Sequence, residues 1–204
     1  MGKVEQNKKL KKETLLSSAY DLFLSKGPEN TSISEICEKA GVAKGTFYLY
    51  YRNKKDIEQE LIIKHSEAII ISVLKKLQNE NVTEFSDKII YIANSIINYL
   101  NDNREFLKFI DKNLSKGLFS KVLDNTLIKN SDETIFDYKG IYYDMIEESG
   151  YRFNDPDMLL YLVVELVGST VNTSVLYNVP CDIETIKPHL FSAIKAIIES
   201  QKEI

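Results

Sequence analysis

Apolar residues recur three and four positions apart along most of this 204-residue chain, as at Ile33, Ile36, Cys37 and Ala40. This spacing places them on one face of an α-helix, whereas a half-buried strand would alternate at every second residue. Only eight Gly and four Pro interrupt the pattern, so segments that look like strands bounded by turns are scarce. The sequence therefore predicts an all-α fold.

The first helix is expected from about Lys8 to Ser25, because Lys26, Gly27 and Pro28 then stop it. Nine more helical segments follow from the same reasoning. They are expected near residues 32–39, 43–50, 54–78, 84–101, 104–114, 116–128, 132–149, 156–177 and 183–202.

Two of these segments are short and lie close together. Ser32 and Glu35 have the spacing of a capping box at the start of the first, and Gly41 suits a left-handed stop at its end. Two short helices joined by a Gly-containing turn predict a helix-turn-helix. The pair cannot bury its own core, so the first helix is expected to supply a third wall. Its apolar stripe is Leu16, Ala19, Tyr20, Phe23 and Leu24.

The second short helix has a composition that suits a DNA surface. Lys44 adds positive charge, Gly45 lets a backbone approach closely, and Thr46 and the following tyrosines offer hydroxyl groups. Lys54 opens the next long helix, whose free N–H groups favour an anion. An ordinary alternative stands beside this one: the lysines could be solvated surface charge. Phe47 is expected in the core rather than in DNA.

From Ser32 to Ile57 the sequence resembles the DNA-binding signature of the tetracycline-repressor (TetR) family. The Ala-Gly-Val turn, the Lys-Gly-Thr helix start and the later Asn-Lys all fall in order. The resemblance covers about residues 10–57, a quarter of the chain. It implies an all-α homodimer with a helix-turn-helix domain at residues 1–53. A helical domain for effector binding and dimerisation would occupy residues 54–204.

The resemblance also implies roles for single residues in contact with DNA. These residues are Ser32, Ser34, Lys44, Gly45, Thr46, Tyr48, Tyr50 and Lys54. Two positions depart from the family pattern. Tyr51 stands where Phe is usual, so its ring must be buried and its hydroxyl must find a partner. Ser34 stands where many members carry Arg, which puts a base contact from that helix in doubt.

The C-terminal part is rich in aromatic residues, most of which are expected in the core. Some are expected to line an apolar cavity for a small-molecule effector. The candidates are Tyr91, Phe106, Phe109, Tyr142, Glu165 and Asn172. The segment 159–177 is apolar on nearly every side, which predicts core on one side and a partner subunit on the other. We expect a homodimer through the last two helices.

Charge is divided unevenly along the chain, although the total is only −4. Residues 1–55 hold eleven Lys and Arg against six Asp and Glu, a balance of +5, and the rest carry −9. The basic module coincides with the helix-turn-helix, which favours DNA as its partner. The lysines before residue 13 either grip a phosphate, lie in a groove or form an ordinary solvated tail.

Catalytic and cofactor motifs are missing from the sequence, which argues against an enzyme and against a bound metal or cofactor. No signal peptide is recognisable and the longest uninterrupted apolar run has seven residues, so a cytoplasmic protein without a membrane span is expected. The predicted function is a ligand-responsive transcriptional regulator, a repressor, that binds a palindromic operator as a homodimer and is released by its effector. The alternative is a helical-bundle enzyme or small-molecule-binding protein that does not bind DNA.

Overall fold

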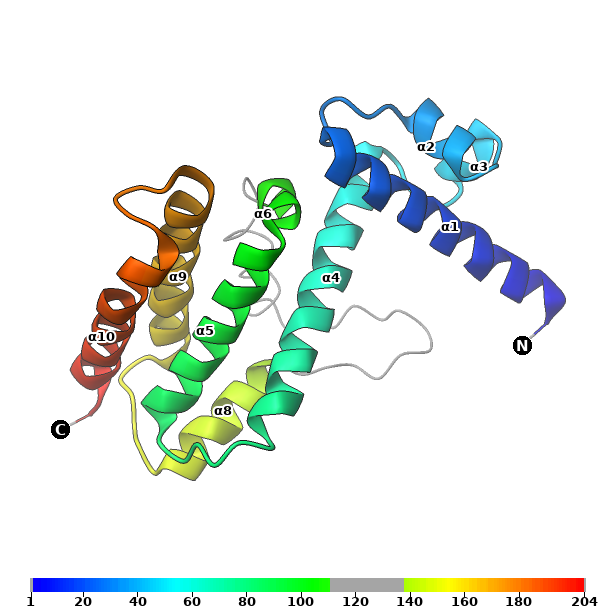
Figure 1. The fold of residues 1–204 in the computed structure, drawn as a ribbon. Coiled ribbons are helices and arrows are strands. Elements are labelled where there is room, and N and C mark those ends of the chain that lie inside the picture. Colours follow the sequence, from blue (N-terminus) through cyan, green and yellow to red (C-terminus); the bar gives the residue numbers. More distant parts are fainter. Residues whose placement is uncertain (1, 111–137, 204) are drawn as a thin grey trace.

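The structure, a computed structural model, describes residues 2–110 and 138–203. These residues form nine α-helices, shown in Figure 1. In chain order they are α1 Lys3–Lys26, α2 Ile33–Lys39, α3 Lys44–Tyr48, α4 Lys54–Leu77, α5 Phe85–Asp102, α6 Arg104–Ile110, α8 Tyr138–Ser149, α9 Pro156–Tyr177 and α10 Ile183–Gln201. Among the described residues the β pairing amounts to one isolated bridge, so the predicted all-α class is confirmed. The helix expected near 116–128 lies outside the described residues.

Local signals set the start and end of α2 as predicted, whereas α3 is shorter than the predicted 43–50. At the start of α2 the Ser32 side chain and the Glu35 side chain each accept the other residue's backbone N–H, which completes the capping box. At its end Gly41 has φ of +66°. The N–H of Gly41 donates to the carbonyl of Glu38, and that of Val42 donates to Cys37. This pair of bonds is a Schellman motif, which turns the chain sharply into α3.

The long helix α4 connects the helix-turn-helix to the rest of the molecule (Figure 1). Asn53 caps it by accepting the N–H of Asp56 at 3.0 Å. Near its start Ile57, Leu61 and Ile62 are buried, and α1 packs against this helix. Near its end Val73 and Leu77 are buried where it packs on α5. One rigid element therefore belongs to both halves of the fold.

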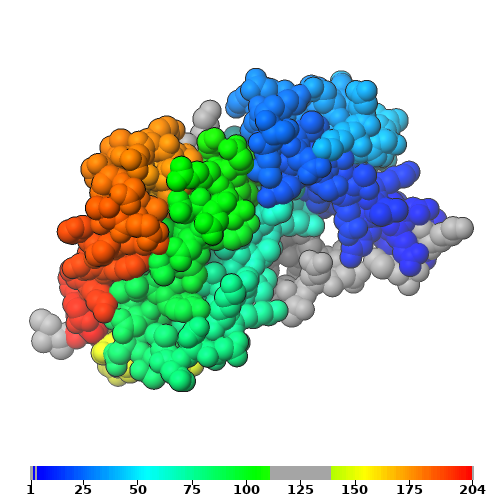
Figure 2. Space-filling model, viewed as in Figure 1, coloured from blue at the N-terminus to red at the C-terminus, as the bar shows by residue number. Residues whose placement is uncertain are grey.

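Helix α5 lies at the centre of the C-terminal half and packs against α4, α6, α8, α9 and α10. Its buried side chains follow a spacing of three and four: Phe85, Ile89, Ala93, Ile97 and Leu100. Helices α9 and α10 pair with one another on the side away from the helix-turn-helix (Figures 1 and 2).

Aromatic rings join the two halves where α1 meets α4 and α6. The ring of His65 on α4 is stacked on Tyr20 of α1, with centroids 3.9 Å apart and planes 11° from parallel. Phe106 of α6 lies 5.7 Å from His65, and Phe109 of α6 lies 5.6 Å from Phe23 of α1. We call these five rings the aromatic junction.

Candidate nucleic-acid interface

Helix α3 is anchored by one side chain. Phe47 is fully buried, as predicted, and packs against the ring of Tyr51. Because Phe47 points inward, its neighbours on the other side of this five-residue helix face solvent. Lys44 and Gly45 are exposed, and Tyr48 is 53% exposed. The helix thus presents a basic and hydroxyl-bearing surface to solvent while Phe47 stays packed in the core.

Gly45 has no structural reason within the chain to be glycine. Its φ is not positive, and a Cβ added there would meet nothing within 4 Å. Glycine in a helix costs about 1 kcal/mol relative to alanine. The missing side chain therefore leaves room for something outside the protein to approach the backbone.

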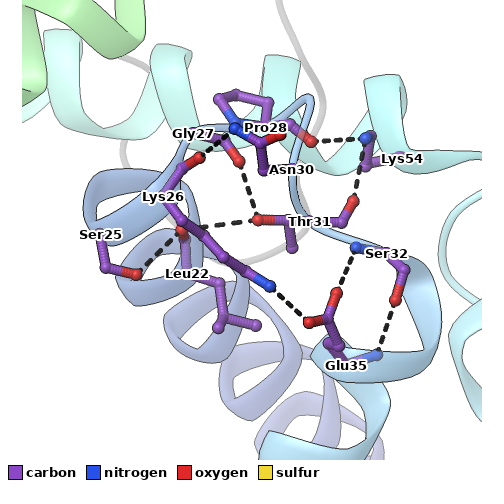
Figure 3. Close-up of polar contacts among 10 residues, drawn as sticks. All are labelled: Leu22, Ser25, Lys26, Gly27, Pro28, Asn30, Thr31, Ser32, Glu35 and Lys54. Atoms are coloured by element: carbon purple, nitrogen blue, oxygen red, sulfur yellow. Dashed lines mark hydrogen bonds and ion pairs between the residues drawn. The ribbon is translucent and has the colours of Figure 1, made fainter.

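The start of α2 is held by polar contacts that Figure 3 shows in full. The Ser32 hydroxyl oxygen accepts from the N–H of Glu35 at 3.2 Å, and Glu35 Oε2 accepts from the N–H of Ser32 at 2.8 Å. Lys26 Nζ binds the other carboxylate oxygen of Glu35. The hydrogen bond from Lys26, with those from Ser32, lowers the pKa of Glu35 to about 2. Ser32 is a cap, as predicted, and its hydroxyl oxygen acts there as an acceptor.

Lys54 lies in the same cluster, but its ammonium turns toward the protein. Its Nζ donates to the carbonyl oxygens of Pro28 and Thr31, the latter at 2.9 Å (Figure 3). The Thr31 hydroxyl in turn donates to the carbonyl of Gly27 at 2.9 Å. Two of the three donors on Lys54 therefore fix the loop between α1 and α2, and one is left for a phosphate.

Tyr50 and Tyr51 follow α3 and turn toward α1 and α4. The Tyr50 hydroxyl donates to the carbonyl of Lys8 at 3.1 Å, so its proton is used within the protein. The ring of Tyr51 is buried as predicted, but its hydroxyl makes no hydrogen bond with the described residues. Burial, and then the negative charge of Glu60, raise the pKa of Tyr51.

The predicted residues therefore divide into two groups. Ser32, Ser34, Lys44, Gly45 and Tyr48 are exposed and Thr46 is half-buried, which leaves them able to meet a ligand. Tyr50 and Lys54 are engaged by the protein itself.

Leu49 was not among the predicted DNA contacts, yet its side chain is 79% exposed at the end of α3. The signal that could have identified it is a leucine two residues after the buried Phe47, and so off the core-facing side.

The six candidate effector residues do not form one cluster. Phe106 and Phe109 are buried in the aromatic junction, where Phe106 packs against His65 of α4 and Phe109 packs against Phe23 of α1. Tyr142 lies at the other end of α5, where it contacts Phe85 and donates to the carbonyl of Pro156. The 18 residues of α5 separate these two positions by about 27 Å at 1.5 Å per residue.

The remaining candidates lie along α5 and α9. Tyr91, Glu165 and Asn172 are each half-buried, and the side-chain oxygen of Asn172 is buried without a hydrogen-bond partner among the described residues.

A short helix held by one buried ring, after a capped helix and a Schellman turn, defines a helix-turn-helix of the DNA-binding class. Residues 15–61 match the family described as "Bacterial regulatory proteins, tetR family". The uncharacterized HTH-type transcriptional regulator YdgC of Bacillus subtilis is 28% identical over 99 residues, which are 48% of this chain and 51% of that protein. Residues 15–61 therefore form a DNA-binding domain of the TetR family.

Solved structures share the fold over nearly the whole chain. A TetR-family regulator from Syntrophomonas wolfei has a TM-score of 0.66 at 19% identity and covers 93% of this chain and 95% of its own. FadR from Bacillus subtilis, solved in complex with stearoyl-CoA, has a TM-score of 0.62 at 17% identity, with coverages of 89% and 96%. The chain spans about half the length of YdgC.

Proposed function

We propose that this protein is a transcriptional regulator that binds double-stranded DNA by placing α3 in the major groove. The observation that carries the proposal is the outward surface of α3. Lys44, Gly45 and Tyr48 face solvent because Phe47 is the side chain of α3 that is buried in the core. Residues 1–55 also carry a balance of +5, which attracts phosphates, while the rest of the chain is acidic. The family is one of regulators and not of enzymes.

Within this proposal residues 1–53 form the DNA-binding domain, and residues 54–204 form the domain for effector binding and dimerisation. Ser32, Ser34, Lys44 and Tyr48 contact phosphates, and Thr46 contacts a base or the backbone. Tyr50 and Lys54 act mainly by holding α3 and the loop before α2 in place, since the Tyr50 proton and two of the three Lys54 donors are used internally. A repressor that works in the cytoplasm fits this arrangement.

The dimer would form through α9 and α10. Helix α9 buries Leu159, Val163, Val171 and Val175 against its own chain, yet Leu162 on another side is 38% exposed. By length and composition alone α9 is also apolar enough to cross a membrane. A second copy would cover this surface, because two such pairs form a four-helix interface.

The dimer is tested with Leu162→Glu, which places a charge on the exposed face of α9. We expect the wild type to sediment as a dimer and the variant as a monomer. Leu10→Glu is the matched control, because Leu10 is 61% exposed on α1 and far from α9. A wild type that is monomeric at micromolar concentration would contradict the dimer.

The effector would bind in the C-terminal half and favour a state in which the two α3 helices no longer match the operator spacing. The junction of α1 with α6 gives such a change a direct route to the DNA-binding domain. Stearoyl-CoA, seen in FadR of Bacillus subtilis, makes acyl-CoA one class to include in a ligand panel. A ligand at 100 times its Kd would add about 2.7 kcal/mol to the free energy of unfolding.

DNA binding is tested by fluorescence anisotropy with duplexes from upstream of the gene and with duplexes selected from a random pool. We expect specific binding that weakens steeply with salt. Thr46→Ala should change the preference between operators as well as the affinity, whereas Lys44→Ala should weaken all duplexes alike. No binding to any duplex at low salt would instead favour the helical-bundle protein that does not bind DNA.

A further inference from the structure

The first turns of α1 extend beyond the core of the molecule. Every side chain from Val4 to Lys11 whose burial is described is exposed, and the buried stripe of α1 begins only at Leu15. Figures 1 and 2 show this end of α1, in dark blue, projecting past α3. We call residues 4–11 the α1 extension.

The α1 extension continues a helix face that is already oriented. Leu15 and Ala19 lie on the packed face of α1, and steps of three or four residues back along that face reach Lys11, Lys8 and Val4. The face that carries core residues further along the helix therefore carries two lysines where the core has ended.

Contacts place the α1 extension beside the end of α3. The carbonyl of Lys8 accepts from the Tyr50 hydroxyl at 3.1 Å, two residues after α3 ends. One turn later, Lys12 binds Glu60 at 2.9 Å and lies 5.8 Å from the centre of the Tyr51 ring. The α1 extension is thus bound near the end of α3 through Lys8, and its residues before Lys8 are exposed to solvent.

The lysines of the extension are not neutralised within the described residues. Lys12 has an ion pair, but Lys8, Lys9 and Lys11 make none with residues 2–110 or 138–203. Like charges three and four residues apart repel one another on a helix. A helix of this length without tertiary support is also marginal in water. A row of phosphates would remove the repulsion and support the helix.

We propose that the α1 extension is a second DNA contact, in which Lys8 and Lys11 bind backbone phosphates next to the groove that α3 occupies. This inference rests on the proposed DNA-binding function and adds a contact that the helix-turn-helix alone does not make. From Val4 to Lys11 the helix rises about 10 Å, which corresponds to about three base-pair steps.

The test compares two double variants. In Lys8→Gln/Lys11→Gln both lysines of the extension lose their charge, and Gln keeps the helix propensity. In the control, Lys75→Gln/Lys76→Gln, two exposed lysines at the far end of α4 lose theirs. Affinity for a selected duplex is measured by anisotropy from 50 to 200 mM salt, and thermal unfolding verifies that both variants fold.

We expect the slope of log affinity against log salt to fall by about 1.8 in the extension variant, at about 0.9 per phosphate contact, and to stay unchanged in the control. Trimming the duplex outside the α3 site should weaken the wild type and not the extension variant. Equal slopes for the wild type and both variants would overturn the α1 extension contact and leave α3 binding intact. A wild type that binds no DNA would overturn the proposed function itself.

Discussion

Lys54 at the start of α4 donates a hydrogen bond of 2.9 Å to the carbonyl oxygen of Thr31, just before α2. The same ammonium donates to the carbonyl of Pro28, so it holds the loop between α1 and α2 at two points. The hydroxyl of Thr31 adds a third contact within this loop, because it donates to the carbonyl of Gly27. The position of α2, and through it that of α3, thus depends on a cation 23 residues away in sequence.

Lys54→Met should lower the free energy of unfolding by about 1–3 kcal/mol, because the two carbonyls lose their charged donor. The salt dependence of DNA binding should stay close to that of the wild type. Lys55→Met, at the exposed neighbouring position, is the control and should leave stability unchanged. A stable Lys54→Met variant whose salt slope drops by about 0.9 would instead make Lys54 a phosphate contact.

Gly45→Ala should have opposite effects on stability and on DNA binding. Alanine removes the flexibility of glycine and should stabilise α3 by up to about 1 kcal/mol, since its Cβ meets no atom of the described residues within 4 Å. The same methyl group should weaken operator binding severalfold by blocking close approach of the DNA backbone. Urea unfolding and anisotropy measure the two effects. Unchanged or tighter DNA binding would contradict the proposed placement of α3.

Glu35→Gln should remove a component of acid sensitivity. The pKa of Glu35 is lowered to about 2 from a usual 4.5, so the folded state keeps the carboxylate charged where the unfolded chain takes up a proton. Its stabilising effect is complete above about pH 4.5 and is lost as the pH falls toward 2. Glutamine keeps the capping-box hydrogen bond but has no charge.

The melting temperatures of wild type and Glu35→Gln should therefore differ most near neutral pH and converge near pH 2. Glu38→Gln, at an exposed position on the same helix, serves as the control. A constant difference across the whole range would mean that the Lys26 pair contributes nothing that depends on pH.

His65 should make stability depend on pH in the mildly acidic range. Burial lowers the pKa of His65 below its usual 6.5, so the folded state holds the ring neutral between Tyr20 and Phe106. As the pH falls through about 6.5 the unfolded chain binds a proton that the folded chain does not, and stability declines. His65→Phe should flatten this decline, as followed by urea unfolding at several pH values. His189→Phe, at the exposed second histidine, should leave it as it is.

Features set by neighbouring residues were predictable from the sequence. The capping box at Ser32 and the left-handed Gly41 depend on residues at most five positions apart, and the structure has both. The bounds of α9 and α10 were likewise predicted within a residue, and local hydrogen bonds to Asp155 and Asp182 cap their starts.

Features that depend on how distant segments meet were not predictable. The apolar spacing of α6 indicates that Phe106 and Phe109 are buried, but not that their rings pack against His65 of α4 and Phe23 of α1. A lysine at a helix start predicts affinity for an anion, and only the path of residues 27–31 shows why Lys54 turns to carbonyls instead. The open space at Gly45 also follows from packing alone.

The sharing of α4 between the two halves has a consequence for synthesis on the ribosome. The first three helices lack a wall of their core until Ile57, Leu61 and Ile62 have emerged, and the Tyr20 ring lacks its stacking partner until His65 follows. A nascent chain that stops at residue 53 would expose these apolar faces to chaperones. Helix α3 thus reaches its final position only after the first turns of α4 have been made.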